Sequence, residues 1–170
     1  VLSHTYRLSS QRSDQGMAMD PENRLLWRMN RRRLDAESLL DAILSVSGSL
    51  DSQIGGSTIR DGTANDYNYK HSGNRRAVYW PVFRNSLPDI FVAFDFANPS
   101  MVTGRRDVSS TAPQALFLMN NPWVIEQAEK TAVRLLAREK LSHQDRFQQA
   151  MLLTLGRAAT AEELRVTLEF

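Results

Sequence analysis

Apolar side chains in the first third of the chain follow a helical period. Between residues 34 and 46 they recur at the i, i+3, i+4, i+7 spacing of an amphipathic helix. Just upstream, Asp20-Pro21-Glu22 has the residue types that begin a helix: a capping side chain, a proline for the first turn and an acid for the positive end of the dipole. The pattern predicts one long helix or two abutting helices over about 21–47, ended by Gly48 in the left-handed conformation.

A polar segment follows that is rich in glycine. Five of the eight glycines lie between residues 48 and 74, among Asp, Asn and Ser. The segment has too few apolar residues to offset a backbone ordering cost of about 1–2 kcal/mol per residue. We therefore predict a long surface loop over 48–74 with little regular structure, and loops of this length are commonly functional or disordered.

Two short apolar runs in the middle of the chain have the composition of β-strands. Residues 77–83 and 90–94 are rich in β-branched and aromatic side chains, and turn-forming residues bound them. Pro81 restricts the first run to a sheet edge or a broken strand, and residues 84–88 can join the two runs as a hairpin. This predicts a small β element, followed by an irregular stretch over 95–112.

From Thr111 onward the pattern is helical. A short apolar helix is predicted to begin at Pro113 and to end at Asn120. The next helix has Glu126 four residues before Lys130, the favourable order for an ion pair on a helix surface. Its predicted core stripe consists of Ile125, Ala128, Ala132 and Leu135.

Two more helices are predicted at the end of the chain. Ser142 caps the first, which Gly156 ends, and Thr160 with Glu163 forms a capping box for the second. The core stripe of the first consists of Phe147, Met151 and Leu155. Because only residues 156–159 separate the two helices, we expect them to lie antiparallel as an αα-hairpin.

Together these elements predict a mainly α fold with a small β element (α+β). Its parts are a bundle-like packing of helices, a short central β-hairpin and the long glycine-rich loop. We assign residues 1–170 to a single domain or to a fragment of one from the C-terminal part of a larger protein, with 111–170 as its C-terminal helical region.

The composition excludes several classes of site. Without cysteine, the chain has no thiol nucleophile, disulfide, Cys-ligated zinc or iron–sulfur cluster. The three histidines, His4, His71 and His143, are scattered, so we predict no metal site, and no P-loop or G-x-G-x-x-G motif points to a bound cofactor. No run approaches the roughly 20 apolar residues of a membrane span.

Arginine carries most of the basic charge. Of the 21 basic residues, 18 are arginines, and residues 1–34 hold seven of them against three acids. On a helix, Arg31, Arg32 and Arg33 would point about 100° apart, so we predict that at least one is buried and paired. Such a fan lacks the one-sided footprint of nucleic-acid binding, and no nucleic-acid partner is predicted.

Carboxylates beside aromatic or cationic residues are the main candidates for chemistry. Asp95 lies between two phenylalanines, and Asp107 follows Arg105 and Arg106. Perturbed carboxylates gather at active sites, but structural ion pairs perturb them as well. Two interpretations therefore stay open. In one, an Asp95–Arg contact fixes the loop over 97–110; in the other, Asp95 or Asp107 acts catalytically on glycans with the neighbouring arginines.

Weaker candidates lie elsewhere along the chain. The loops contribute three further acids, Asp61, Asp66 and Asp89. Three tryptophans could stack on sugars, although such residues are more often core or interface anchors: Trp27, Trp80 and Trp123. Neither a G-x-S-x-G nor an S-x-x-K motif supports a serine nucleophile.

An ordered series of motifs runs through nearly the whole chain. It consists of HTYRLSS, DPENRLLWRMNRRRLDAESLLDAIL, RRAVYWPVFRN, FDFANPS, GRRDVSSTAPQALFLMNNPWV and LLTLGRAATAEEL. In this order the motifs resemble the C-terminal domain of unknown function 1553 of large planctomycete and verrucomicrobial proteins. That family has no established catalytic residues, so none is carried over.

The resemblance implies a context for the chain. Such proteins typically begin with a signal peptide and a cytochrome-c-like domain, and some are associated by gene context with sulfatases and polysaccharide breakdown. It implies a periplasmic or otherwise exported protein in which any haem c binds an upstream domain, because no C-x-x-C-H occurs here. Our first hypothesis is a non-catalytic interaction or structural module, with other domains of the same polypeptide and polysaccharide as candidate partners. The alternative is the glycan-processing enzyme domain.

Overall fold

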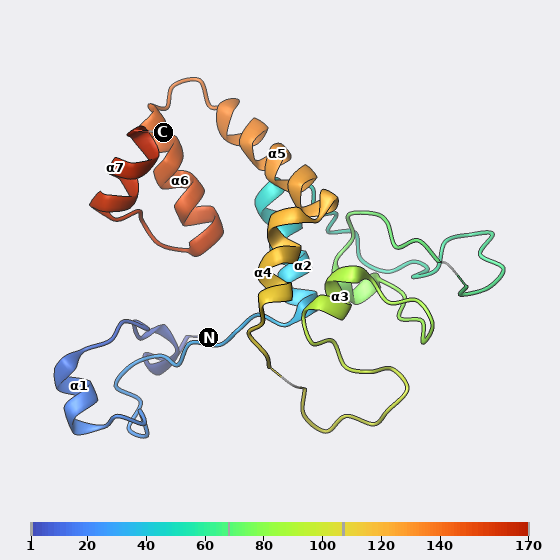
Figure 1. Ribbon diagram of the computed structural model, residues 1–170, viewed down its shortest axis with the longest axis horizontal. Coiled ribbons are helices and arrows are strands. Elements are labelled where there is room, and N and C mark those ends of the chain that lie inside the picture. The colour runs from blue at the N-terminus through green and yellow to red at the C-terminus, as the bar shows by residue number, and fades with distance from the viewer. Residues whose placement is uncertain (1, 68, 107, 170) are drawn as a thin grey trace. The chain divides into compact units, whose positions relative to one another are not determined.

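The computed structural model describes residues 2–67, 69–106 and 108–169. These fold as two compact units, Val1–Arg33 and Leu34–Phe170. The α-helices are α1 Asp14–Met19, α2 Ala36–Ser47, α3 Asp89–Ala93, α4 Ala112–Asn120, α5 Pro122–Leu136, α6 His143–Leu155 and α7 Ala161–Glu169, and the 3-10 helices are η1 Thr5–Arg7 and η2 Ala77–Tyr79 (Figure 1). The described residues contain no β-strand, only two isolated bridges, so the predicted α+β class with a central β-hairpin is wrong and the fold is helical.

The first unit is a short helix followed by tight turns. The Asp20 carboxylate accepts hydrogen bonds from the backbone N–H groups of Arg24 at 3.0 Å and Leu25 at 2.7 Å, as a capping residue would. No helix follows, because Asn23 and Leu26 both have φ of 55°, outside the right-handed helical region. The helix predicted over 21–47 therefore forms only from Ala36 onward.

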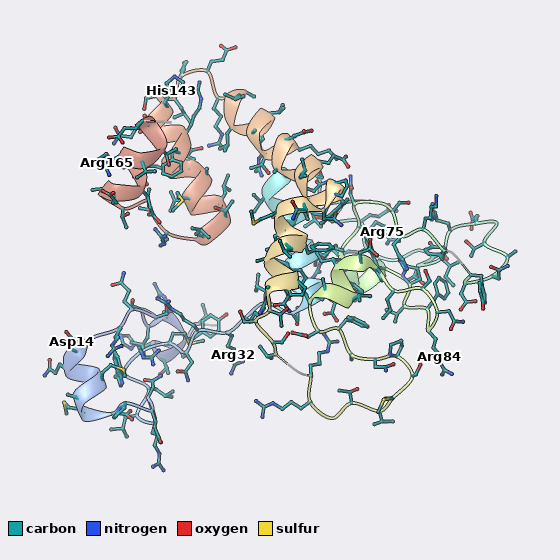
Figure 2. The ribbon with its side chains drawn as sticks, viewed as in Figure 1. Asp14, Arg32, Arg75, Arg84, His143 and Arg165 are labelled. Carbon is teal, nitrogen blue, oxygen red and sulfur yellow. The ribbon has the colours of Figure 1, made fainter. Side chains whose placement is uncertain are left out.

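The arginine run lies outside any helix. Arg31, Arg32 and Arg33 occupy an irregular segment and all three are exposed; Arg32 is labelled in Figure 2. The prediction that one of them is buried is wrong, because it assumed the angular fan of a helix that does not form here.

Helix α2 is the centre of the second unit. Asp35 caps it by accepting a hydrogen bond from the Ser38 N–H at 2.8 Å, and this contact with Ser38 lowers the pKa of Asp35. Gly48, with φ of 78°, ends it as predicted. Its inner face packs against η2, α3 and α5. The buried apolar core is formed by Ala36, Leu40, Leu44, Ala77, Ile90, Phe91 and Phe94.

The two runs predicted as strands form short helical turns instead. Ile90, Phe91 and Phe94 are buried, whereas Val92 is 68% exposed. Alternation in a strand would have placed Val92 on the same side as Ile90, so the burial follows a helical spacing. The helix begins after Pro88, whose C=O accepts hydrogen bonds from Phe91 and Val92, and the chain leaves it at Asp95, with φ of 57°.

The glycine-rich segment forms the predicted surface loop. It contains no helix or strand among its described residues, and most of these are exposed. Its two ends meet where the Asp51 N–H donates to the Asn74 C=O at 2.7 Å. The loop is therefore anchored at its base by backbone pairing with the start of the next segment.

Helix α5 packs on α2 through polar contacts. The buried Gln127 accepts a hydrogen bond from the Ser47 hydroxyl at 2.9 Å. The Arg134 guanidinium donates to the C=O groups of Ser45 at 3.0 Å and Val46 at 2.8 Å. The predicted core stripe of this helix is wrong, because Ile125, Ala128 and Ala132 are exposed. The predicted Glu126–Lys130 ion pair is present at 2.7 Å.

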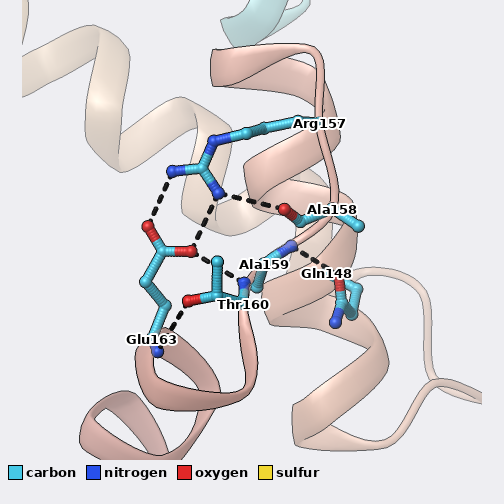
Figure 3. A network of polar contacts seen from close by, with 6 residues as sticks. All are labelled: Gln148, Arg157, Ala158, Ala159, Thr160 and Glu163. Atoms are coloured by element: carbon cyan, nitrogen blue, oxygen red, sulfur yellow. Dashed lines mark hydrogen bonds and ion pairs between the residues drawn. The ribbon is translucent and has the colours of Figure 1, made fainter. Parts of the chain in front are cut away.

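Helices α6 and α7 contact each other across a short turn, as expected (Figure 1). Figure 3 shows the polar network that fixes this turn. The Glu163 carboxylate accepts from the Arg157 guanidinium at 2.7 and 2.8 Å and from the Thr160 N–H at 2.8 Å, and the Glu163 N–H donates to the Thr160 hydroxyl. These contacts, with the Arg157 pair the strongest, lower the pKa of Glu163 to about 2. The predicted capping box is confirmed.

None of the helices in the described part of the chain is both long and apolar enough to span a bilayer.

Leu44→Ala tests the core directly. Leu44 is fully buried, so the substitution removes apolar contacts and leaves a cavity, and we expect the free energy of unfolding to fall by about 2–5 kcal/mol. Urea unfolding measures this loss. The matched control is Leu136→Ala, at a position that is 61% exposed; equal losses in both variants would contradict the described core.

Candidate functional site

A cavity of about 620 Å³ lies where the end of the glycine-rich loop meets the beginning of α5. Three segments distant in sequence form most of its lining: 69–74 from the loop, 86–90 leading into α3, and 121–127 at the start of α5; Leu40, Trp80 and Phe117 complete it. Sites for small ligands typically have volumes of about 300–1,000 Å³. This is the larger of the two cavities described here, and it is the candidate functional site.

Aromatic rings form one wall of the cavity. The His71 ring stacks on Trp80 with centroids 5.9 Å apart and planes 8° apart, and the Tyr69 ring meets His71 edge-on at 5.0 Å. The indole N–H of Trp80 donates to the Arg75 C=O at 3.0 Å, which fixes the position of its ring. Trp123, in the first turn of α5, also lines the cavity.

His71 is held in one neutral form. Its Nε2 lies 3.0 Å from the Ser86 C=O. Because a carbonyl only accepts, Nε2 carries a proton, and in the neutral ring Nδ1 then holds the lone pair. Burial is the largest effect on this ring and lowers its pKa. Nδ1 is buried without a hydrogen-bond partner among the described residues. The residue therefore serves as part of the aromatic wall.

Polar groups complete the lining. Asp89 and Glu126 are exposed carboxylates at the cavity, and Lys70 is an exposed cation that also lines it. The Asn121 side chain accepts from the Trp123 N–H at 3.0 Å, which caps α5 and fixes the direction in which this helix leaves the cavity. An aromatic wall with a few polar groups is typical of sites that hold small ligands.

The described residues contain no group of three or more His, Asp or Glu side chains that could hold a metal ion. The cavity itself brings together one neutral histidine and two exposed carboxylates.

Asp95, the main candidate from the sequence, lies outside the lining of this cavity, and its carboxylate accepts hydrogen bonds that connect two segments of the chain. Its carboxylate accepts from the Ser109 N–H and hydroxyl, each at 2.8 Å, and from the buried Gln114 amide at 3.4 Å. These contacts tie the loop after α3 to the start of α4, as the first interpretation of Asp95 expected. The contacts described come from a serine and a glutamine, however, whereas an arginine was expected.

The other candidates are dispersed. Arg106 pairs with Glu37 at 2.7 Å and lies over the Phe96 ring, and Arg105 is exposed. Asp107 lies outside the described residues. Neither Asp95 nor either of these arginines is among the described residues that line the cavity.

Of the weaker candidates, three line the cavity: Asp89, Trp80 and Trp123. Trp27 belongs to the first unit, where its ring packs so closely on Gly16 that an added Cβ would lie 2.5 Å from it. Sequence reasoning missed His71 and Glu126. Only the density of aromatic residues around His71 could have drawn attention to it.

Asp95→Asn separates a structural from a catalytic carboxylate. Asparagine tolerates the left-handed conformation of Asp95, so the substitution removes hydrogen bonds to Ser109 without adding backbone strain. We expect the free energy of unfolding to fall by about 1–3 kcal/mol. Chemical denaturation checks it, with Asp61→Asn in the exposed loop as control; unchanged stability in Asp95→Asn would contradict the structural role.

The His71 ring predicts a pH dependence of stability. Burial lowers its pKa in the folded state below the 6.5 of the unfolded chain, so the unfolded state binds more protons as the pH falls through that value. We expect the melting temperature to be higher at about pH 7.5 than at about pH 5.5, with a smaller difference in His71→Gln. His143→Gln, at the first residue of α6, is the control. If the melting temperature of His71→Gln depends on pH as that of the unchanged chain does, the lowered pKa of His71 is contradicted.

Comparison with known proteins supports one relation. No curated protein and no solved structure matches the chain. The model of the family described as PSD1, protein of unknown function (DUF1553), matches residues 1–170. Since this match covers the full length, the chain belongs to the DUF1553 family.

Proposed function

We propose that this chain is a non-catalytic binding and interaction module of a larger exported protein, and that its cavity holds a short segment of a polysaccharide. One observation carries the proposal. The cavity of about 620 Å³ brings Trp80 and Trp123 together with the exposed carboxylates of Asp89 and Glu126.

The chemistry of this lining matches that of a sugar. A pyranose ring has an apolar face of C–H groups that packs against an aromatic ring, and a rim of hydroxyl groups that donate hydrogen bonds. Trp80 and Trp123 offer the aromatic surface, while Asp89 and Glu126 offer acceptors without the cost of desolvating a buried charge. The neutral His71 keeps the aromatic wall uncharged at neutral pH.

The geometry favours binding over catalysis. Glycosidases prepare a general acid by burying one carboxyl group of a pair, whereas Asp89 and Glu126 are both exposed. The Asp95 carboxylate, central to the enzyme alternative, accepts hydrogen bonds from Ser109 and Gln114. These observations favour the binding module over the glycan-processing enzyme.

The wider context is part of the same proposal. The resemblance stated for the sequence supports an exported parent protein, with a cytochrome-c-like domain that carries haem c upstream of this chain. Other domains of the same polypeptide are then the natural partners of the module. The many exposed apolar side chains of the helices, among them Leu116, Met119, Val133 and Leu155, are consistent with such partners.

Titration with neutral oligosaccharides tests the proposal. Cellohexaose, xylohexaose and mannohexaose are added separately while tryptophan fluorescence and heat of binding are recorded. We expect saturable binding of at least one of them, weakened about two- to twelvefold in Trp123→Ala, because an aromatic stacking contact is worth about 0.5–1.5 kcal/mol. Asp89→Ala should weaken the same binding without loss of the core.

The matched controls lie outside the cavity. Trp27→Ala also removes one tryptophan, but from the first unit, and Glu139→Ala removes an exposed acid that follows α5. Both should bind as the unchanged chain does. Absence of binding by all three saccharides, or equal loss in the control variants, would contradict the proposal, and release of shorter saccharides during the titration would favour the enzyme instead.

A further inference from the structure

A second, smaller cavity lies behind the aromatic wall. It measures about 150 Å³ and shares with the larger cavity Tyr69, His71, Ser72, Gly73 and Trp80. Its far side is formed by residues 57–60 of the glycine-rich loop, together with Arg75 and Tyr79. The two cavities therefore flank one wall, but their other lining residues differ in charge.

Two guanidinium groups line this cavity, and neither forms an ion pair with a carboxylate among the described residues. Arg60 donates to the Lys70 C=O and to the Tyr69 hydroxyl. Arg75 donates from one amino nitrogen to the Ser57 C=O at 3.0 Å, and from the other to the C=O groups of Gln53 and Gly55. The partly buried Arg75 guanidinium thus meets neutral acceptors of the loop, while the exposed Arg60 is solvated by water as well.

One donor at this site has no acceptor. The Nε of Arg75 is buried and has no hydrogen-bond partner among the described residues. A buried N–H without a partner costs about 1–3 kcal/mol; the Nε groups of Arg28 and Arg146 are in the same state but line neither of the two described cavities. The ring of Tyr79 lies 4.2 Å from the Arg75 guanidinium carbon and holds this side chain in place.

We propose that the cavity between Arg60 and Arg75 is a binding site for a small oxyanion, the carboxylate or phosphate group of a ligand. The planar fork of a guanidinium matches both groups, and an anion would supply the acceptor that the Arg75 Nε lacks. The volume suits a single such group, while the exposed Ser72 and Thr58 add hydroxyl donors at the rim. This site is separate from glycan binding, and either proposal can fail without the other.

Nuclear magnetic resonance of the arginine Nε–H groups tests the site in the whole chain. Sodium phosphate and sodium acetate are titrated separately at constant ionic strength, with sodium chloride as the reference. We expect the Arg60 and Arg75 signals to shift with saturation. Saturation by phosphate alone supports a phosphate site, and saturation by acetate, with or without phosphate, supports a carboxylate site.

Two variants and a control examine the mechanism. Arg75→Lys keeps the charge but removes Nε and the fork, and Arg60→Gln removes one charge; each should weaken binding about tenfold or more. Arg84→Gln removes an exposed arginine that is not among the described residues lining either cavity and should bind unchanged (Arg75 and Arg84 are labelled in Figure 2). The proposal is overturned if the signals of the unchanged chain never saturate, or if Arg84→Gln reduces the affinity as much as the other two variants do. Where a variant does not fold, the titration of the unchanged chain alone decides the proposal.

Discussion

The second unit depends on the burial of one helix. Helix α2 has three residues with no exposed surface, Ala36, Leu40 and Leu44, one turn apart on a single face. Against this face pack the turn at Ala77 and the short helix α3. Because these segments are too short to be stable alone, their conformation follows from the surface on which they pack. Leu40 of this face also lines the larger cavity, and Trp80 and Trp123 pack against the same core.

Polar contacts then fix the orientation of these pieces. The Asp41 carboxylate, on α2, accepts from the Ala77 N–H at 2.6 Å and from the Arg76 guanidinium at 3.1 Å, which sets where the chain returns after the glycine-rich loop. Ser47 and Gln127 join the other end of α2 to α5. A buried polar pair has a narrow range of acceptable geometry, since either group alone would lack a partner. The apolar face supplies the stability, and these pairs determine the register.

Most of the elements with local signals were predicted from the sequence, although the start signal at Asp20-Pro21-Glu22 was misleading. The caps at Ser142 and Thr160 and the stops at Gly48 and Gly156 were found because each depends on residues within one turn. The helix α3 was not, because a five-residue apolar run fits a strand and a helix equally well, and only its packing on α2 decides. The predicted core residues of α5 were wrong for a related reason. The inner face of this helix carries Gln127, whose hydrogen-bond partner Ser47 is 80 residues away.

The difference between local and long-range signals also explains why the sequence did not predict the cavity. Asp95 attracted attention because its phenylalanine neighbours are visible in sequence, yet its structural partners Ser109 and Gln114 lie 14 and 19 residues away. The cavity arises only when 69–74, 86–90 and 121–127 converge, and no local pattern encodes that convergence. Arg75 makes one local and one longer-range set of contacts. Its backbone C=O accepts a hydrogen bond from the Trp80 indole, and its side chain donates to carbonyl groups of the glycine-rich loop. A single residue at the base of the loop thus positions the wall that the two cavities share.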